Sequence, residues 1–132
     1  MAREEGKQRA GRVGERIREE LMDLFLKGAV HDPGVADVVI SAVRVSDDLS
    51  HARIYVRLLG EATPAKQKRA LDALERASGF LRREVGRRLA IRTSPELRFH
   101  WDDVVDQALR IESLFDEIHR DDERRGGGGK KS

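Results

Sequence analysis

Apolar residues along the chain follow two spacings, one typical of helices and one typical of strands. Over residues 13–25 they recur every three or four positions, and Gly28 marks the expected end of this first helix. Residues 38–45 are rich in β-branched side chains and predict a strand. Apolar and polar residues then alternate over 52–58, which predicts a second strand paired with the first as a hairpin. The expected sheet has one buried and one polar face.

A longer helical pattern follows the hairpin and is interrupted near its middle. Thr63 and Pro64 supply a capping side chain and a first-turn proline. The triplet Ala77, Ser78, Gly79 breaks the pattern, because a glycine inside a helix costs about 1 kcal/mol relative to alanine. We therefore expect one helix before the triplet, a kink, and another helix after it.

The rest of the chain predicts a third strand and a terminal helix. Alternation over 97–101 indicates the strand, and helical spacing over 104–118 indicates the helix. We expect a flexible basic arm over 1–11, one α+β domain over 12–119 that includes the terminal helix, and a disordered glycine-rich tail over 120–132.

Composition favours a binding protein over an enzyme. The 132 residues include no cysteine, which excludes disulfides and cysteine-based metal sites, and the four histidines lie in separate predicted elements without metal-ligand spacing. We expect no cofactor and no catalysis; Asp102 and Asp103 stand where a helix begins, so capping explains them better than acid–base chemistry. No apolar stretch reaches membrane-spanning length, and the first residues lack a signal-peptide core, so the expected location is cytoplasmic.

Charge is distributed unevenly along the chain. The formal net charge is +2, yet residues 64–92 carry nine Lys and Arg against three acidic residues, a net +6. Residues 96–123 carry ten acidic residues against three arginines, a net −7. The protein should therefore have a basic and an acidic side.

The arginines around the third helix have few acidic neighbours in the sequence, since only Glu84 lies among them. A solvated charged face would explain many such runs, but a face built for solubility usually mixes signs. Arginine also binds phosphate in a bidentate way, which suits an RNA backbone. The triplet has two interpretations: small residues where helices cross closely, or a glycine that lets a phosphate approach. The candidate RNA-binding residues are Arg9, Arg12, Arg16, Lys66, Arg69, Ala77, Ser78, Gly79, Arg82, Arg83, Arg87, Arg88 and Arg92.

Aromatic residues add one further candidate. Phe80, Phe99 and Trp101 lie on or beside apolar stripes, and we expect them in the core. Tyr55 alternates onto the polar face of the second strand, where it either stacks on a base or packs against a neighbouring strand.

Several stretches, taken in order, resemble the ribosome-binding factor A family of bacterial small-subunit maturation factors. The match covers most of residues 9–119, and the order and spacing of its parts are what make it specific. The matching stretches are residues 12–26, the turn at Asp32 and Pro33, the hairpin 43–56 with Ser46, Asp48, Leu49, Ala52 and Tyr55, the triplet 77–79, and residues 95–118 with Leu97, Phe99, Asp102, Arg110 and Ile111.

The resemblance implies a KH-like fold of the second type, ordered α-β-β-α-kink-α-β, in which an Ala-x-Gly kink replaces the usual GxxG loop. It also implies binding to the small ribosomal subunit, a role in late maturation of its ribosomal RNA, and a link to growth in the cold. We expect a non-catalytic monomer without membrane contact. Two alternatives stay open: a protein-interaction module that uses the acidic terminal helix, and a generic KH-type binder of single-stranded RNA.

Overall fold

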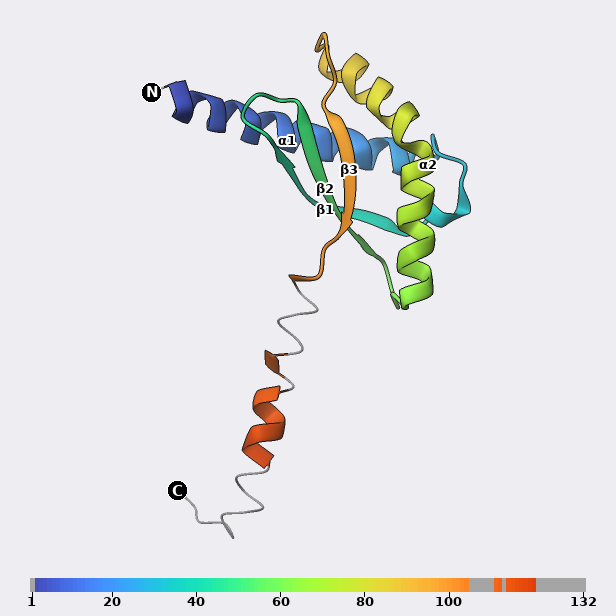
Figure 1. Ribbon diagram of the computed structural model, residues 1–132. Helices are drawn as coiled ribbons and strands as arrows, with labels where there is room; N and C mark the ends of the chain where they lie inside the picture. The colour runs from blue at the N-terminus through green and yellow to red at the C-terminus, as the bar shows by residue number, and fades with distance from the viewer. Residues whose placement is uncertain (1, 105–110, 113, 121–132) are drawn as a thin grey trace. The chain divides into compact units, whose positions relative to one another are not determined.

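The computed structural model describes residues 2–104, 111, 112 and 114–120. Contacts within the chain define two units, Met1–Asp102 and Asp103–Ser132. In the described part of the first unit, helices combine with one sheet, which confirms the predicted α+β class (Figure 1). In chain order its elements are α1 (Ala2–Leu26), the short 3₁₀ helix η1 (Pro33–Val35), β1 (Val38–Val45), β2 (His51–Leu58), α2 (Pro64–Leu89) and β3 (Glu96–Trp101).

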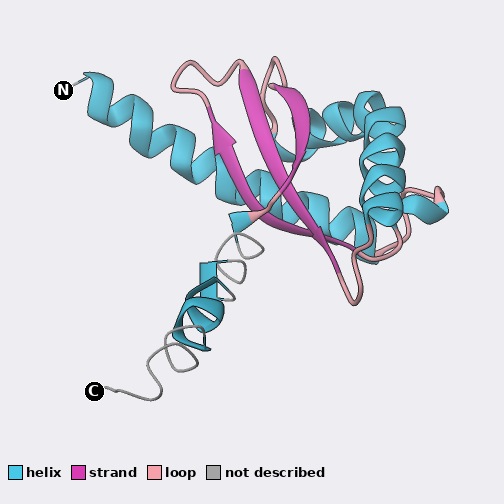
Figure 2. Ribbon diagram, turned by 60° about the horizontal axis from the view of Figure 1, so that its bottom comes forward, coloured by secondary structure: helices cyan, strands magenta, loops and turns pink. Residues whose placement is uncertain are grey.

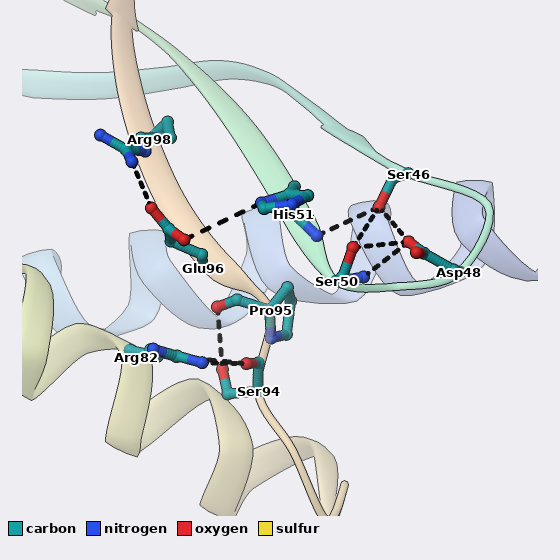
Figure 3. A network of polar contacts seen from close by, with 9 residues as sticks. All are labelled: Ser46, Asp48, Ser50, His51, Arg82, Ser94, Pro95, Glu96 and Arg98. Atoms are coloured by element: carbon teal, nitrogen blue, oxygen red, sulfur yellow. Dashed lines mark hydrogen bonds and ion pairs between the residues drawn. The ribbon is translucent and has the colours of Figure 1, made fainter.

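The sheet has the strand order β1-β2-β3. β1 and β2 pair antiparallel as the predicted hairpin, with an irregularity between Ile40 and Ala42. β2 and β3 pair parallel, so the chain must cross over between them, and α2 is that connection. In the hairpin loop, the Asp48 carboxylate accepts hydrogen bonds from the hydroxyls of Ser46 and Ser50, both at 2.7 Å (Figure 3).

The core lies between one face of the sheet and the two long helices. Ile17 of α1, Ile54 of β2 and Leu74 of α2 are fully buried in one cluster. Figure 2 shows α1 passing behind the three strands. Since alternate residues of a strand point to opposite faces, Arg53 and Tyr55 lie on the other, open face, as the alternation predicted.

The first helix begins eleven residues earlier than predicted. α1 starts at Ala2, and Ala10 is only 4% exposed, so the helical spacing of buried residues extends back from Ile17 through Ala10. Residues 2–12 are polar, but Ala, Arg, Glu, Lys and Gln all favour helix, and propensity here outweighs the lack of large apolar side chains. The predicted start near residue 13 is therefore wrong. The division of the chain at 11/12 and 119/120 stays a prediction.

The second and third predicted helices are one helix. α2 is helical without a break through Ala77, Ser78 and Gly79, so the separation into two helices is wrong. Both ribbon views show α2 changing direction along its length (Figures 1 and 2). Ser78 donates its hydroxyl hydrogen bond to the carbonyl oxygen of Glu75 at 2.8 Å, and Ser–Gly pairs and such back-bonding bend helices without ending them.

Residues 111, 112 and 114–120 of the second unit are helical, in agreement with the predicted terminal helix at those positions. Their large apolar side chains, Ile111, Leu114, Phe115 and Ile118, are 53–66% exposed. The predicted disordered tail lies, from residue 121 onward, outside the described residues.

Candidate nucleic-acid interface

α2 holds its basic side chains outward because its opposite side is anchored in the core. Ala70, Leu74, Leu81 and Val85 are fully buried along one stripe. The helix begins with the Thr63 hydroxyl accepting a hydrogen bond from the Lys66 amide at 3.2 Å, as a capping side chain should. It ends at Leu89, and the capping residue Ala90 adopts a left-handed conformation with φ 55°. The basic last turn also suits the negative end of the helix dipole.

The second half of α2 and the following loop border an open, shallow hollow of about 570 Å³ lined by arginines. We call this the arginine hollow. It brings together five of the thirteen predicted residues. Its lining is Gly79, Arg82, Arg83, Gly86, Arg87, Ile91, Arg92 and Ser94.

Of the four arginines that line the hollow, three form no ion pair with a described carboxylate, and Arg87 forms one. Arg82 donates from Nε and Nη2 to the carbonyl oxygen of Ser94, at 3.2 and 3.1 Å, which fixes the guanidinium without neutralising it (Figure 3). Arg87 pairs with Glu84 at 2.6 Å, and this bond holds the pKa of Glu84 below its ordinary value. Arg83 and Arg92 form no ion pair with any described residue.

Arg88 has a different role from its neighbours. Its Nη1 donates to Asp23 at 2.7 Å and to Glu20 at 2.8 Å, and only 20% of its side chain is exposed. The bond to Asp23, followed by that to Glu20, raises the pKa of Arg88, and the bond to Arg88 lowers the pKa of Asp23. Arg88 thus joins α2 to α1, and we remove it from the candidate interface.

Three predicted residues form a stripe on α1. Arg9, Arg12 and Arg16 are exposed and, at spacings of three and four, lie on one helical face. Arg16 lies 3.6 Å from Glu20, which also binds Arg88. The stripe therefore reaches the second half of α2 through this ion-pair network.

Lys66 and Arg69 do not join the other candidates. They lie in the first turns of α2, beside a separate hollow of about 330 Å³ that Pro33 and Gly34 also line. At 1.5 Å per residue, Lys66 is about 30 Å along the helix from Arg87. The predicted set thus divides into two places on α2 and one on α1.

The triplet contributes mainly shape. Ala77 and Ser78 are half-buried, and the Ser78 hydroxyl is already engaged with its own helix. Gly79 is exposed and lines the arginine hollow. An added Cβ at Gly79 would meet only the Arg83 Nη1 atom, at 3.5 Å, so the position has room for a larger residue.

The sequence model of one family, described as ribosome-binding factor A, matches residues 9–115. A ribosome-binding factor A from Syntrophobacter fumaroxidans is 39% identical over 115 residues, 87% of this chain and 97% of that protein. One from Chromohalobacter salexigens is 42% identical over 115 residues, 87% of each chain. The chain belongs to the ribosome-binding factor A family.

Solved structures of the ribosome-binding factor A family share the fold. The crystal structure of the Thermus thermophilus factor has a TM-score of 0.60 and 28% identity, over 70% of this chain and 93% of that one. A homology model of the Thermus thermophilus factor, fitted into a cryo-electron-microscopy map of a 30S complex, has a TM-score of 0.53 and 29% identity, over 67% and 90%.

Phe80 is a surface residue of the α2 bend that the sequence did not reveal. Its exposed fraction is 36%, so the prediction of a core position is wrong. At 100° per residue it stands beside the stripe rather than on it, about 100° from Leu81. Phe99 and Trp101 do pack against the core, as predicted.

Among the described residues, no three histidine or acidic side chains gather as a metal site, and no helix is long and apolar enough to cross a membrane.

Proposed function

We propose that this protein is a non-catalytic factor that binds the small ribosomal subunit and assists the late maturation of its ribosomal RNA. The observation that carries the proposal is the arginine hollow, where Arg82, Arg83, Arg87 and Arg92 surround one concave surface. Membership of the ribosome-binding factor A family supports it, as does the fitting of a related factor into a 30S complex. With a ribosomal partner, we expect the protein to act in the cytoplasm and as a monomer.

Phosphate groups are the ligands that this surface fits. Guanidinium groups bind phosphate oxygens through paired hydrogen bonds, and contacts of this kind position a protein without reading sequence. Gly79 and Gly86 place small residues two turns apart on the lining, which leaves space for an RNA backbone between the arginines. Specificity would then come from fit to a folded ribosomal surface.

The bend in α2 sets the angle of the arginines. The fold order agrees with the KH-like arrangement that we propose, with Ala77–Gly79 in place of a GxxG loop. Because the backbone remains helical there, its amides stay hydrogen-bonded and do not form an anion-binding loop. The triplet therefore orients the hollow rather than gripping RNA.

The test is cosedimentation with purified small subunits. Arg83→Gln with Arg92→Gln should weaken binding roughly tenfold, because two phosphate contacts are lost. Lys27→Gln with Lys68→Gln is the matched control: it removes the same charge from side chains that are 67% and 78% exposed and lie outside the hollow. Equal binding by both double variants, with circular dichroism showing intact folds, would refute the assignment of the surface.

A second candidate function rests on the terminal helix. Ile111, Leu114, Phe115 and Ile118 are more than half exposed, and Glu112, Asp116 and Glu117 lie among them, so this helix could dock on a protein. Such a module would bind ribosomal proteins equally well after nuclease treatment and show no salt-dependent binding to RNA. A generic KH-type binder would instead hold short oligonucleotides as tightly as it holds subunits.

A further inference from the structure

The open face of the sheet carries a row of three arginines in direct register. Arg44 of β1 pairs with Arg53 of β2, which pairs with Arg98 of β3. All three are exposed. Neighbouring strands lie about 4.8 Å apart, so the row spans roughly 10 Å across the whole sheet.

Such a row is electrostatically unfavourable for the fold itself. Like charges directly opposite one another destabilise a strand pair. Arg98 forms an ion pair with Glu96 at 2.5 Å. The pKa of Glu15 is lowered mainly by its hydrogen bond to Arg18, and Arg44 contributes to the same lowering. The side chain of Arg53, in the middle, forms no hydrogen bond or ion pair with any described residue. A fold-stabilising role does not account for this arrangement.

Aromatic side chains lie next to the row on the same face. Tyr55 and His100 occupy the adjacent register position, and their ring centroids are 5.7 Å apart with planes tilted by 32°. Tyr55 is half-buried and His100 exposed, so one ring is supported while the other reaches solvent. At the end of β3 the Arg57 guanidinium lies 5.4 Å from the centre of the Trp101 ring, which packs against the core.

We propose that this open sheet face binds a short stretch of single-stranded RNA, separately from the arginine hollow. The arginine row complements the phosphates, and the Tyr55–His100 pair offers a ring surface for a base. Flat sheets with central aromatics and flanking positive charge bind single strands in this way, because every base has a stacking surface. An acidic peptide would satisfy the arginines but would leave the aromatic pair without a partner.

The experiment measures the affinity of the full chain for a fluorescently labelled eight-nucleotide RNA of mixed sequence across a salt series. Arg44→Gln, Arg53→Gln and Arg98→Gln combined should lower affinity and make the slope of log K against log salt shallower by about 2, since each phosphate contact contributes about 0.7. Tyr55→Leu should lower affinity roughly tenfold through lost stacking. Arg53→Gln alone should weaken RNA binding while leaving thermal stability unchanged or raised, because it relieves repulsion.

Two controls separate this surface from other sources of binding. Lys27→Gln with Lys68→Gln should leave the affinity for RNA nearly unchanged. If this variant loses as much affinity as the sheet variants, net charge alone explains RNA binding and the proposal is overturned. The double variant Arg83→Gln, Arg92→Gln tests subunit binding by the arginine hollow, whereas the sheet variants test oligonucleotide binding by the open face. A failure of either proposal is therefore distinguishable from a failure of the other.

Further outcomes decide against RNA. Unchanged oligonucleotide affinity in the sheet variants overturns the proposal. A second result also overturns it: a polyglutamate peptide binds the protein more tightly than the RNA does, and its affinity falls in the arginine variants but not in Tyr55→Leu. The face would then be a site for an acidic protein segment.

Discussion

Arginines on the same helix do different work here, and their partners decide which. Arg88 lies between two carboxylates of α1, whereas Arg82 is held by the neutral carbonyl of Ser94. Arg83, in the next position along the chain, has no ion-pair partner among the described residues. One arginine therefore stabilises the fold, one is positioned, and one is free to bind an anion.

Arg88→Met should lower stability without weakening subunit binding. The methionine keeps an apolar stem but leaves Glu20 and Asp23 without their shared cation, so their negative charges repel. Urea unfolding should show a lower midpoint than for wild type.

Arg87→Met is the matched change for Arg88→Met. It breaks only the pair with Glu84, in which the arginine side chain is 68% exposed, and exposed pairs contribute little to stability. Equal midpoints for the two variants would contradict the structural role of Arg88.

Asp48→Asn should make the protein less sensitive to acid. Hydrogen bonds from the Ser50 hydroxyl, the Ser46 hydroxyl and the Ser50 amide lower the pKa of Asp48 from 3.8 to about 2. Because the folded pKa is the lower one, the carboxylate stabilises the fold above pH 3.8, and this contribution is lost as the pH falls toward 2.

The measurement for Asp48 is the melting temperature between pH 5 and 2. Wild type should lose more stability over this window than Asp48→Asn. Asp47→Asn, at the neighbouring exposed position, should follow wild type; if Asp48→Asn also follows wild type, the loop network does not set the acid response.

At the scale of elements, two glycines in or against α2 differ in the space around them. A Cβ on Gly34 of η1 would lie 2.8 Å from the Ala73 Cβ and 3.0 Å from the Arg69 carbonyl oxygen, so the turn packs directly on α2. Gly79 has open space, since its nearest neighbour is the flexible end of Arg83. One glycine serves close packing and the other serves the bend.

Gly34→Ala should destabilise the protein by about 1–3 kcal/mol, because backbone and helix must move apart. Gly79→Ala should stabilise α2 by up to about 1 kcal/mol through helix propensity while weakening subunit binding, because it straightens the helix that presents the arginines. Chemical denaturation and cosedimentation of both variants check this. Unaltered subunit binding by Gly79→Ala would remove the bend from the mechanism.

Periodicity identified the elements of the first unit but not where helices begin and end. The alternation in β2 predicted its buried face, because strand geometry puts every second side chain on one side. Periodicity did not predict the start of α1 or the continuity of α2. Helix propensity extends α1 through a polar segment, and packing on the sheet holds α2 helical through Gly79.

At the scale of the whole molecule, basic and acidic charges occupy different parts of the chain. Residues 64–92 carry a net +6 and residues 96–123 a net −7, from nine against three and three against ten charged side chains. RNA is attracted to basic surfaces of such a chain and repelled by its acidic part, so binding should depend on ionic strength.

Subunit binding should weaken steeply with salt. Four phosphate contacts from the arginine hollow predict a slope of about −3 for log K against log salt. Cosedimentation between 50 and 200 mM salt, as a rough working range, measures it. The Arg83→Gln, Arg92→Gln variant should show a shallower slope by about 1.5; a wild-type slope near zero would favour the protein-interaction module.

Part of the candidate site was predictable because charge imbalance is visible in the sequence. The clustering of Arg82, Arg83 and Arg87 could be expected from their spacing on one helix, whereas Arg92 joins them from the loop that follows α2. The distance of Lys66 from these arginines could not be predicted without knowing that α2 is one long helix. The ion-pair network of Arg88 depends on α1, whose residues lie more than sixty positions earlier in the chain.

The sequence by itself determined the α+β class, the buried face of the hairpin and the family, because local periodicity and motif order are properties of the chain. Only the tertiary structure decided that Arg88 is a structural cation, that Phe80 reaches the surface, and that Arg44, Arg53 and Arg98 form one row. Each of these depends on contacts or register between distant segments, which no local pattern encodes.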